Sequence, residues 1–111
     1  MQTINVARDF TPYPGGRYRR HGKGSGQEFR EQILLPILKA GGSAVIDLDG
    51  ASGYPPSFLD EAFGGLVREG FSPHDIKSHI ELRASPDFAM YINMIWAYIE
   101  RESKRQHASA N

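Results

Sequence analysis

The feature that most constrains this fold is the segment 44–70, in which a short apolar run is followed by a loop with two adjacent prolines and then by a helical pattern. The run 44–48 is almost wholly apolar, which is typical of a central strand buried on both faces. Asp47 and Asp49, at and just beyond its end, are expected where a strand emerges at the carboxyl edge of its sheet. The two prolines keep the loop extended, because each disfavours helical geometry in the residue before it. The segment therefore predicts a strand, a loop and a helix, in that order.

The helix of this segment has recognisable ends. Ser57, with Asp60 three residues later, resembles a capping box in which Asp replaces the usual Glu or Gln, so Ser57 is the expected N-cap. Gly70 is typical of the position just beyond a C-terminal end. We therefore expect a helix over 58–69.

One face of this helix contains two glycines. At 100° per residue the apolar side chains fill one arc, and the opposite arc holds Asp60, Glu61, Gly64, Gly65 and Arg68. Because each glycine costs roughly 1 kcal/mol relative to alanine in a helix, two of them on an outward face indicate the close approach of another surface. That surface is either a partner protein or a neighbouring element of the same chain.

Patterns elsewhere predict the remaining elements. Strands are expected at 3–8 and 79–84, with a further short strand at 17–21. The expected helices are one that begins at the capping box 25–28, bends at Pro36 and ends at Gly41, a short turn at 71–77, and a last helix at 86–104. This order predicts an α/β fold, a mixed β-sheet with helices packed against it.

Length and composition fit a single domain. With 111 residues, 40% of them hydrophobic, the chain can build one modest core. We expect the domain to span 1–105 and the polar residues 106–111 to form a flexible C-terminal tail.

The last helix is apolar on two sides. Its core stripe consists of Phe88, Tyr91, Ile92, Ile95, Trp96 and Ile99. A second stripe, formed by Met90, Met94 and Ala97, lies roughly opposite. A helix that is apolar on two sides needs two partners. The sheet is one of them, and the other is a second subunit, which would make the protein a homo-oligomer, or a loop of this chain.

The string from Ser57 to Val67, together with Val45–Gly50, resembles the core of STAS domains, the family of bacterial anti-sigma-factor antagonists. It is more similar still to a STAS-like family of unknown function. Upstream, Arg8–Phe10 and Pro14–Arg17 also match, and the likeness covers most of residues 3–84. The resemblance implies a STAS-like single domain.

The resemblance also implies a function and a site. In STAS antagonists a Ser or Thr at the start of this helix accepts a phosphate from a partner kinase, and the phosphate prevents binding. By position that residue is Ser57, although Pro55, Pro56 and Phe58 around it depart from the Asp-Ser-Ser-Gly signature of the antagonists. The partner surface in that family is this helix face with its preceding loop, and the partner it implies is a histidine-kinase-like ATPase.

A basic loop precedes the first long helix. Arg17, Arg19, Arg20 and Lys23 lie within seven residues, and no acid occurs between Thr11 and Gln27. Three interpretations remain open: a solvated loop, an anion-binding or partner-binding site beside a helix N-terminus, and a nucleic-acid contact.

Composition excludes several function classes. Thirteen basic and thirteen acidic side chains cancel, so no global field favours nucleic acid or a membrane surface. The chain has no cysteine and begins without the pattern of a signal peptide, so we expect a soluble cytoplasmic protein. No histidine spacing suggests a metal ligand set and no Gly-x-Ser-x-Gly nucleophile motif occurs. Asp47 and Asp49 are either two ligands of a divalent cation or a polar strand end, and we predict no metal and no cofactor.

The leading hypothesis is a non-enzymatic regulatory module that binds a protein partner through the loop 50–57 and the helix face 60–68. The alternative is a small-ligand-binding or nucleotide-binding module that uses the basic loop 17–23.

Overall fold

The computed structural model describes residues 1–109 and contains a sheet of three parallel strands. The strands are β1 (Gln2–Asn5), β2 (Ala44–Asp47) and β3 (Ile80–Arg83), in the spatial order β1-β2-β3. The apolar run thus forms the central strand, and the α/β class is confirmed. In the described part of the chain the sheet is wholly parallel, whereas a mixed sheet was expected.

The sheet is not mixed because the strand expected at 17–21 does not form. This segment contains the short 3-10 helix η1 (Arg19–His21), whose residues are all exposed. A strand made of these charged residues would bury no apolar side chain, which is what stabilises a strand in a sheet. The strand expected at 3–8 ends early as well, because the Asn5 side chain caps helix α1 (Val6–Asp9) by accepting a hydrogen bond from the Arg8 amide at 2.9 Å.

The sheet has one face on the core and one largely exposed face. Ile4, Ile46 and Leu82 are aligned across the three strands and belong to or pack against the hydrophobic core. Glu81 and Arg83 alternate with Leu82 along β3 and are exposed on the other face. The helices therefore cover mainly one face of the sheet.

Two long helices each contain a widened turn. The first runs from α2 (Gly26–Phe29) through the π-helical turn η2 (Arg30–Leu34) into α3 (Leu35–Lys39). The second runs from α4 (Pro56–Leu59) through the π-helical turn η3 (Asp60–Gly64) into α5 (Gly65–Arg68). In the first helix the π turn comes just before Pro36, which has no amide hydrogen to continue a regular α-helical ladder. The first helix is therefore irregular just before Pro36, and the bend at Pro36 itself stays a prediction.

The second helix begins earlier than predicted, and Ser57 is not its N-cap. Pro55 occupies the cap position with φ −58° and ψ 141°, and Pro56 is the first helical residue. Proline is favoured there because its fixed φ suits a helix and no first-turn amide has an intrahelical partner. Ser57 consequently lies inside the helix, and no side chain caps this end. At the other end Gly70 follows the cap with φ +109°, as predicted.

The last elements are α6 (Pro73–His79), the 3-10 turn η4 (Pro86–Phe88) and α7 (Ala89–Ser109). Ser72 caps α6, since its hydroxyl accepts a hydrogen bond from the Asp75 amide at 3.0 Å. Helix α7 continues past the expected end at residue 104, supported by the Glu102–Arg105 pair one turn apart at 2.6 Å. Residues 106–109 of the expected flexible tail are thus helical, and residues 110–111 lie outside the described residues.

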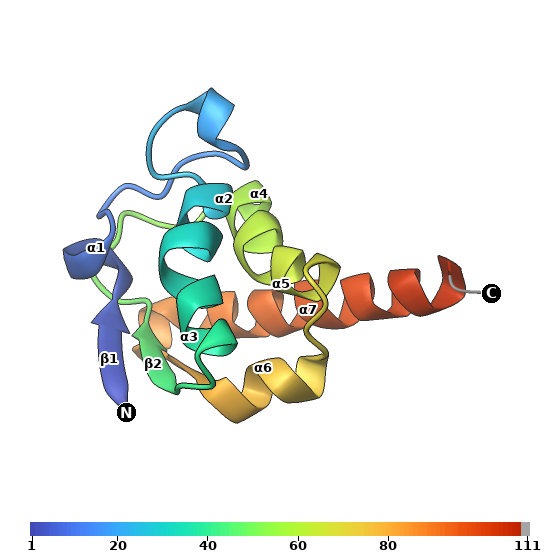
Figure 1. Ribbon diagram of the computed structural model, residues 1–111. Coiled ribbons are helices and arrows are strands. Elements are labelled where there is room, and N and C mark those ends of the chain that lie inside the picture. The colour runs from blue at the N-terminus through green and yellow to red at the C-terminus, as the bar shows by residue number, and fades with distance from the viewer. Residues whose placement is uncertain (110–111) are drawn as a thin grey trace.

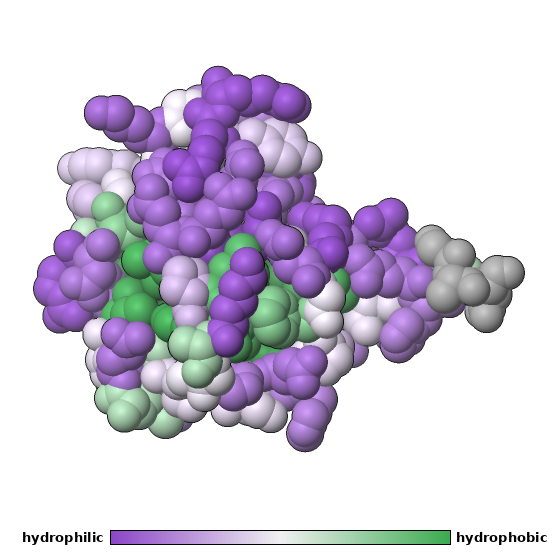
Figure 2. All heavy atoms as spheres, in the orientation of Figure 1, coloured by the Kyte–Doolittle hydropathy of each residue, from purple (hydrophilic) through white to green (hydrophobic). Residues whose placement is uncertain are grey.

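Helix α7 is the longest element and packs against the second long helix. In Figure 1 it runs from beside the strands, past α4 and α5, to the C-terminus at the opposite end of the molecule. Ile95 and Ile99 of the predicted core stripe are fully buried, and Met90 of the second stripe is 56% exposed. Figure 2 shows hydrophilic atoms over the loop at the top and over the projecting end of α7, with hydrophobic atoms gathered near α3. In residues 1–109 no helix combines the length and apolarity that crossing a membrane would require.

Candidate functional site

The loop 50–57 connects β2 to the second long helix and is anchored by Tyr54. The Tyr54 side chain is buried, and its hydroxyl donates a hydrogen bond to the Leu48 carbonyl at 2.7 Å. Its ring makes edge contacts with Tyr91 and Phe88 at the start of the α7 region, with centroid distances of 5.0 and 6.2 Å. One aromatic side chain thus fixes the loop to both the central strand and the last helix.

The electrostatic surroundings keep this anchor intact. Burial raises the pKa of the Tyr54 hydroxyl above its usual value, and the nearby carboxylates of Asp47 and Asp49 raise it further. The hydroxyl is therefore protonated at any physiological pH and remains a hydrogen-bond donor.

The loop also has exposed residues on a backbone that is held in place. Its exposed residues are Gly50, Ser52, Pro55 and Pro56. The Ser52 amide donates to the Pro12 carbonyl at 2.8 Å, and Gly53 has φ +145°, a conformation that residues with a side chain rarely adopt. Ser57, at the end of the loop, is half-buried. The loop therefore presents accessible atoms on a backbone of fixed shape.

The two aspartates at the strand end fasten loops together. The Asp49 carboxylate accepts the Ser85 amide with both oxygens, at 2.9 and 3.1 Å, which ties the loop after β2 to the segment before α7. Asp47 accepts the Asp49 amide at 3.0 Å. Among residues 1–109 no group of three or more His, Cys, Asp or Glu side chains is placed to hold a metal ion. Of the two alternatives, the contacts favour the polar strand end.

Gly64 and Gly65 do not face outward, so that prediction is wrong. Both are buried inside this chain. A Cβ on Gly65 would clash with the guanidinium of Arg30, and a Cβ on Gly64 would lie 2.8 Å from Oδ1 of Asp60. The alternative explanation is correct, because neighbouring elements of the same chain pack against this face: the first long helix at Gly65, and α7 at Gly64, where the Tyr98 carbonyl lies 3.8 Å from the position of a Cβ.

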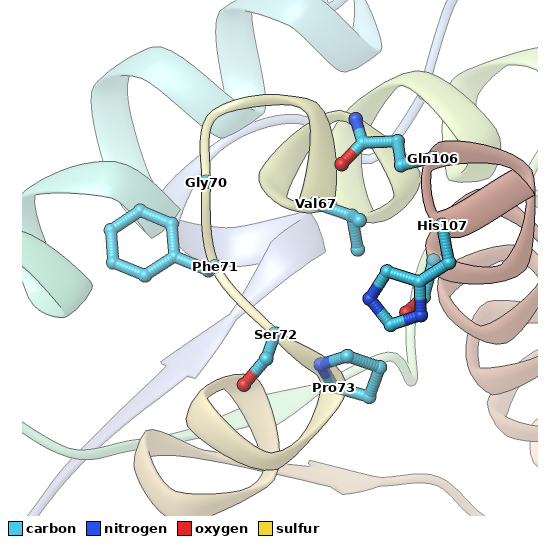
Figure 3. Close-up of a pocket in the computed structure, with 8 residues that line it drawn as sticks. Val67, Gly70, Phe71, Ser72, Pro73, Gln106 and His107 are labelled. Atoms are coloured by element: carbon cyan, nitrogen blue, oxygen red, sulfur yellow. The ribbon is translucent and has the colours of Figure 1, made fainter. Parts of the chain in front are cut away.

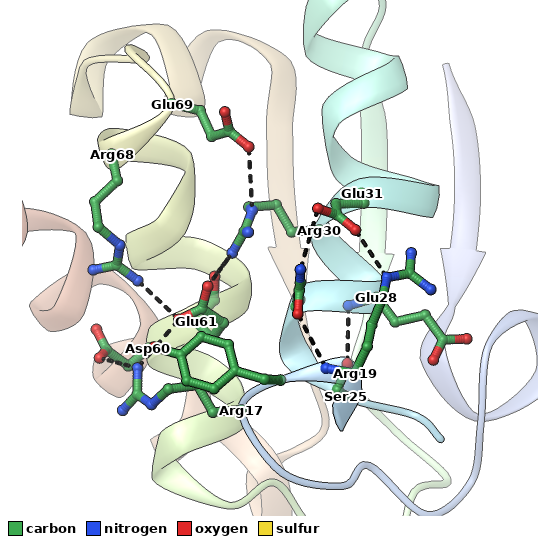
Figure 4. A network of polar contacts seen from close by, with 12 residues as sticks. Arg17, Arg19, Ser25, Glu28, Arg30, Glu31, Asp60, Glu61, Arg68 and Glu69 are labelled. Carbon is green, nitrogen blue, oxygen red and sulfur yellow. Dashed lines mark hydrogen bonds and ion pairs between the residues drawn. The ribbon is translucent and has the colours of Figure 1, made fainter. Parts of the chain in front are cut away.

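A buried ion pair joins the two π turns at this contact (Figure 4). Nη1 of Arg30 donates to Oε2 of Glu61 at 2.7 Å and to the Glu61 carbonyl at 2.5 Å. Both residues are buried, and Nε of Arg30 has no hydrogen-bond partner within the described residues. Removing one member of such a pair strands a charge and costs about 3–5 kcal/mol. Loss of either side chain should therefore destabilise the fold strongly. Because Glu61 is buried, little of its side chain is available to a partner.

Further arginines lie around the same acids. Nη1 of Arg17 contacts Asp60 at 2.8 Å and Glu61 at 3.4 Å. Arg68 contacts Glu61 at 3.2 Å and Glu102 at 3.1 Å. The hydrogen bonds of Glu102 to Arg105, followed by those to Arg68, lower the pKa of its carboxyl to about 2. These contacts tie the loop before η1 and helix α7 to the second long helix.

The basic loop is only partly available for a ligand. Arg17 is paired as described above, and Arg19 pairs with Glu31 at 2.9 Å. Arg20 stacks over the Tyr18 ring, 4.7 Å from its centroid. In the described part of the chain, Arg20 and Lys23 form no ion pair. Two of the four residues predicted to bind an anion are thus used within the protein.

Two pockets lie away from these residues. One, of about 190 Å³, is lined by Val67, Gly70, Phe71, Ser72, Pro73, Ser103, Gln106 and His107. Figure 3 shows it between the connection from α5 to α6 and the last turns of α7. The other, of about 390 Å³, lies between the first residues of β1 and the end of α3. Neither contains a residue of the predicted site.

Sequence reasoning did not identify Tyr54 or Arg30. Tyr54 follows a glycine in a polar loop, a position that gives no periodic signal. Arg30 stands beside the apolar stripe of a helix with a proline, and its guanidinium lies against Gly65 of the other long helix. The sequence signal for the contact between Arg30 and Gly65 is the combination of a glycine pair in one helix with an arginine in another.

A family comparison agrees with the predicted resemblance. The model of a family described as a STAS-like domain of unknown function matches residues 25–85, more than half of the chain. No curated protein and no solved structure matches the chain. The matched part contains β2, β3 and both long helices, whereas β1 and α7 lie outside it.

Proposed function

Because the chain belongs to the family of STAS-like domains of unknown function, we propose that it is a non-enzymatic regulatory module that acts by binding a protein partner. The observation that carries this proposal is the loop 50–57, which exposes Gly50, Ser52, Pro55 and Pro56 and is fastened by Tyr54. A loop with a fixed backbone loses little conformational entropy when it binds, so a larger share of the contact energy appears as affinity.

The helix contributes less to the proposed surface than its sequence suggests. Of the residues predicted there, Ser57, Asp60 and Arg68 keep accessible surface. Glu61, together with both glycines, is buried and serves packing within the chain. The proposed surface is therefore the loop with the accessible side chains of the following helix.

Ser57 is the proposed regulatory residue. It lies in the first turn of the second long helix, where amide groups without intrahelical partners favour a negative charge. A phosphate there would be tolerated by the fold and would change the charge of the proposed surface. The partner to test first is a histidine-kinase-like ATPase of the kind that acts on STAS antagonists.

Two further proposals rest on separate observations. Self-association through Met90, Met94 and Ala97 is supported by the exposure of Met90 and Ala97 on α7. Binding of a small anionic ligand to the basic loop is supported by Arg20 and Lys23, the members of that loop without an ion pair in the described part of the chain.

The test compares two serine-to-arginine variants of the tagged full chain, isolated from its native cells. Ser52→Arg places a large charged side chain in the loop, and Ser78→Arg makes the same change on α6, where Ser78 is also exposed. The expected result is a protein that accompanies the wild type and Ser78→Arg but not Ser52→Arg, with all three folded in thermal unfolding. Equal recovery with both variants would show that the loop is not the contact.

A further inference from the structure

The charged groups along the second long helix and α7 form two layers. The inner layer consists of the acids Asp60, Glu61 and Glu102, whose side chains are 15%, 8% and 7% exposed. The outer layer consists of Arg17, Arg68, Arg101 and Arg105, whose side chains are 30%, 32%, 67% and 64% exposed. Solvent therefore meets mainly guanidinium groups on this surface, which we name the arginine face after its four outer residues.

Shared acids bring these guanidiniums together from distant parts of the chain. Asp60 contacts Arg17 at 2.8 Å through one oxygen and Arg101 at 3.6 Å through the other. Glu102 contacts Arg68 at 3.1 Å and Arg105 at 2.6 Å. The loop before η1, the end of α5 and the second half of α7 thus meet at one surface.

Donor groups remain on this face after the internal contacts are made. A guanidinium has five N–H donors, and Arg17 uses only Nη1 for its contacts with Asp60 and Glu61. Arg101 stacks over the Tyr98 ring, 5.0 Å from its centroid, and its contact with Asp60 at 3.6 Å is too long for a hydrogen bond. Both groups are held in place while several of their N–H donors have no acceptor among the described residues.

The local charge is positive in a chain whose net charge is zero. Counting the buried Arg30 and the nearby Glu69, five arginines contact four carboxylates in this network. The layering matters more than the excess of one charge, because the acids are mostly covered from solvent and the outer arginines are more exposed. An approaching carboxylate would meet donors first, and arginine binds carboxylates in a bidentate geometry.

We propose that the arginine face binds an acidic segment of a protein partner. This inference deepens the proposed function, since it names the chemistry of the partner. Arg17, Arg101 and Arg105 lie outside the residues matched by the family, whereas Asp60 and Glu61 lie within them. The face therefore combines Arg68 of the matched region with three arginines from the parts of the chain that flank it.

The test is a titration of the full chain with a fluorescein-labelled peptide of ten glutamates, followed by fluorescence anisotropy at low salt. Saturable binding that weakens as salt is added is expected. Arg101→Glu, which changes an exposed side chain with no hydrogen bond, should weaken binding on the order of tenfold, because it reverses one charge beside an anionic ligand. Arg83→Glu is the matched control, because Arg83 is 56% exposed on the open face of the sheet. This variant should bind the peptide as tightly as the wild type does.

Three results would overturn the inference: no saturable binding of the peptide, an equal loss in Arg83→Glu, or binding of a ten-residue oligothymidylate that is as tight and as dependent on Arg101. The last result would indicate a general polyanion surface. Failure of the proposed function is distinguishable, because recovery of the native partner by Ser52→Arg would refute the loop contact without changing the peptide titration.

Discussion

Replacing Gly65 by alanine tests whether the buried contact between the two long helices controls stability. On helix propensity alone the change should stabilise the protein, because alanine is favoured over glycine by about 1 kcal/mol. The structure predicts the opposite sign. The new Cβ would overlap the guanidinium of Arg30, which is buried and held by two hydrogen bonds to Glu61.

The expected magnitude follows from these two effects. Displacing Arg30 from Glu61 costs about 3–5 kcal/mol, the usual cost of breaking a buried pair. Subtracting the propensity gain leaves a net destabilisation of about 2–4 kcal/mol. For a domain of this size such a loss lowers Tm by roughly 10 °C or more.

The measurement is urea unfolding of Gly65→Ala in two backgrounds. In the Arg30→Ala background the clashing group is gone, so Gly65→Ala should become neutral or stabilise by up to about 1 kcal/mol. Ala97→Gly, at an exposed position of α7, measures the glycine penalty in this protein directly. If Gly65→Ala is as stable as the wild type in the original background, the reasoning about the Arg30 contact is refuted.

Three other predictions concern single groups. Tyr54→Phe should lower the free energy of unfolding in urea by about 1–3 kcal/mol, because it leaves the buried Leu48 carbonyl unpaired. It should also speed proteolysis of the loop. Unchanged stability would contradict the role of Tyr54 as an anchor. The folded pKa of Glu102 lies near 2, below its ordinary 4.5, so its contribution to stability is present above pH 4.5 and is lost as pH falls toward 2. The stability difference between the wild type and Glu102→Gln should therefore shrink over that window. Ser57→Ala should change stability by less than about 0.5 kcal/mol, whereas Ser72→Ala should cost about 1 kcal/mol, because of these two serines only Ser72 is an N-cap. Thermal unfolding of the two variants measures this difference.

The sequence by itself determined the features that depend on neighbours a few residues apart. The apolar run of β2, the Ser72 cap of α6 and the stop at Gly70 follow from local periodicity and backbone preferences, and all three are present. The family and the α/β class were accessible for the same reason, since they depend on the order of such elements. Even the error at Ser57 was local, because Pro56 at the first helical position competes with a serine cap one residue later.

The tertiary structure alone decided how the helix faces are used. Whether Gly65 faces a partner or Arg30 depends on a residue more than thirty positions away in the sequence, and whether Gly64 is covered depends on the packing of α7. Likewise, Tyr54 becomes an anchor only because the start of α7 packs beside the loop. Burial and charge pairing are properties of neighbours in space, so a pattern along one helix can show that a face is unusual but not what lies against it.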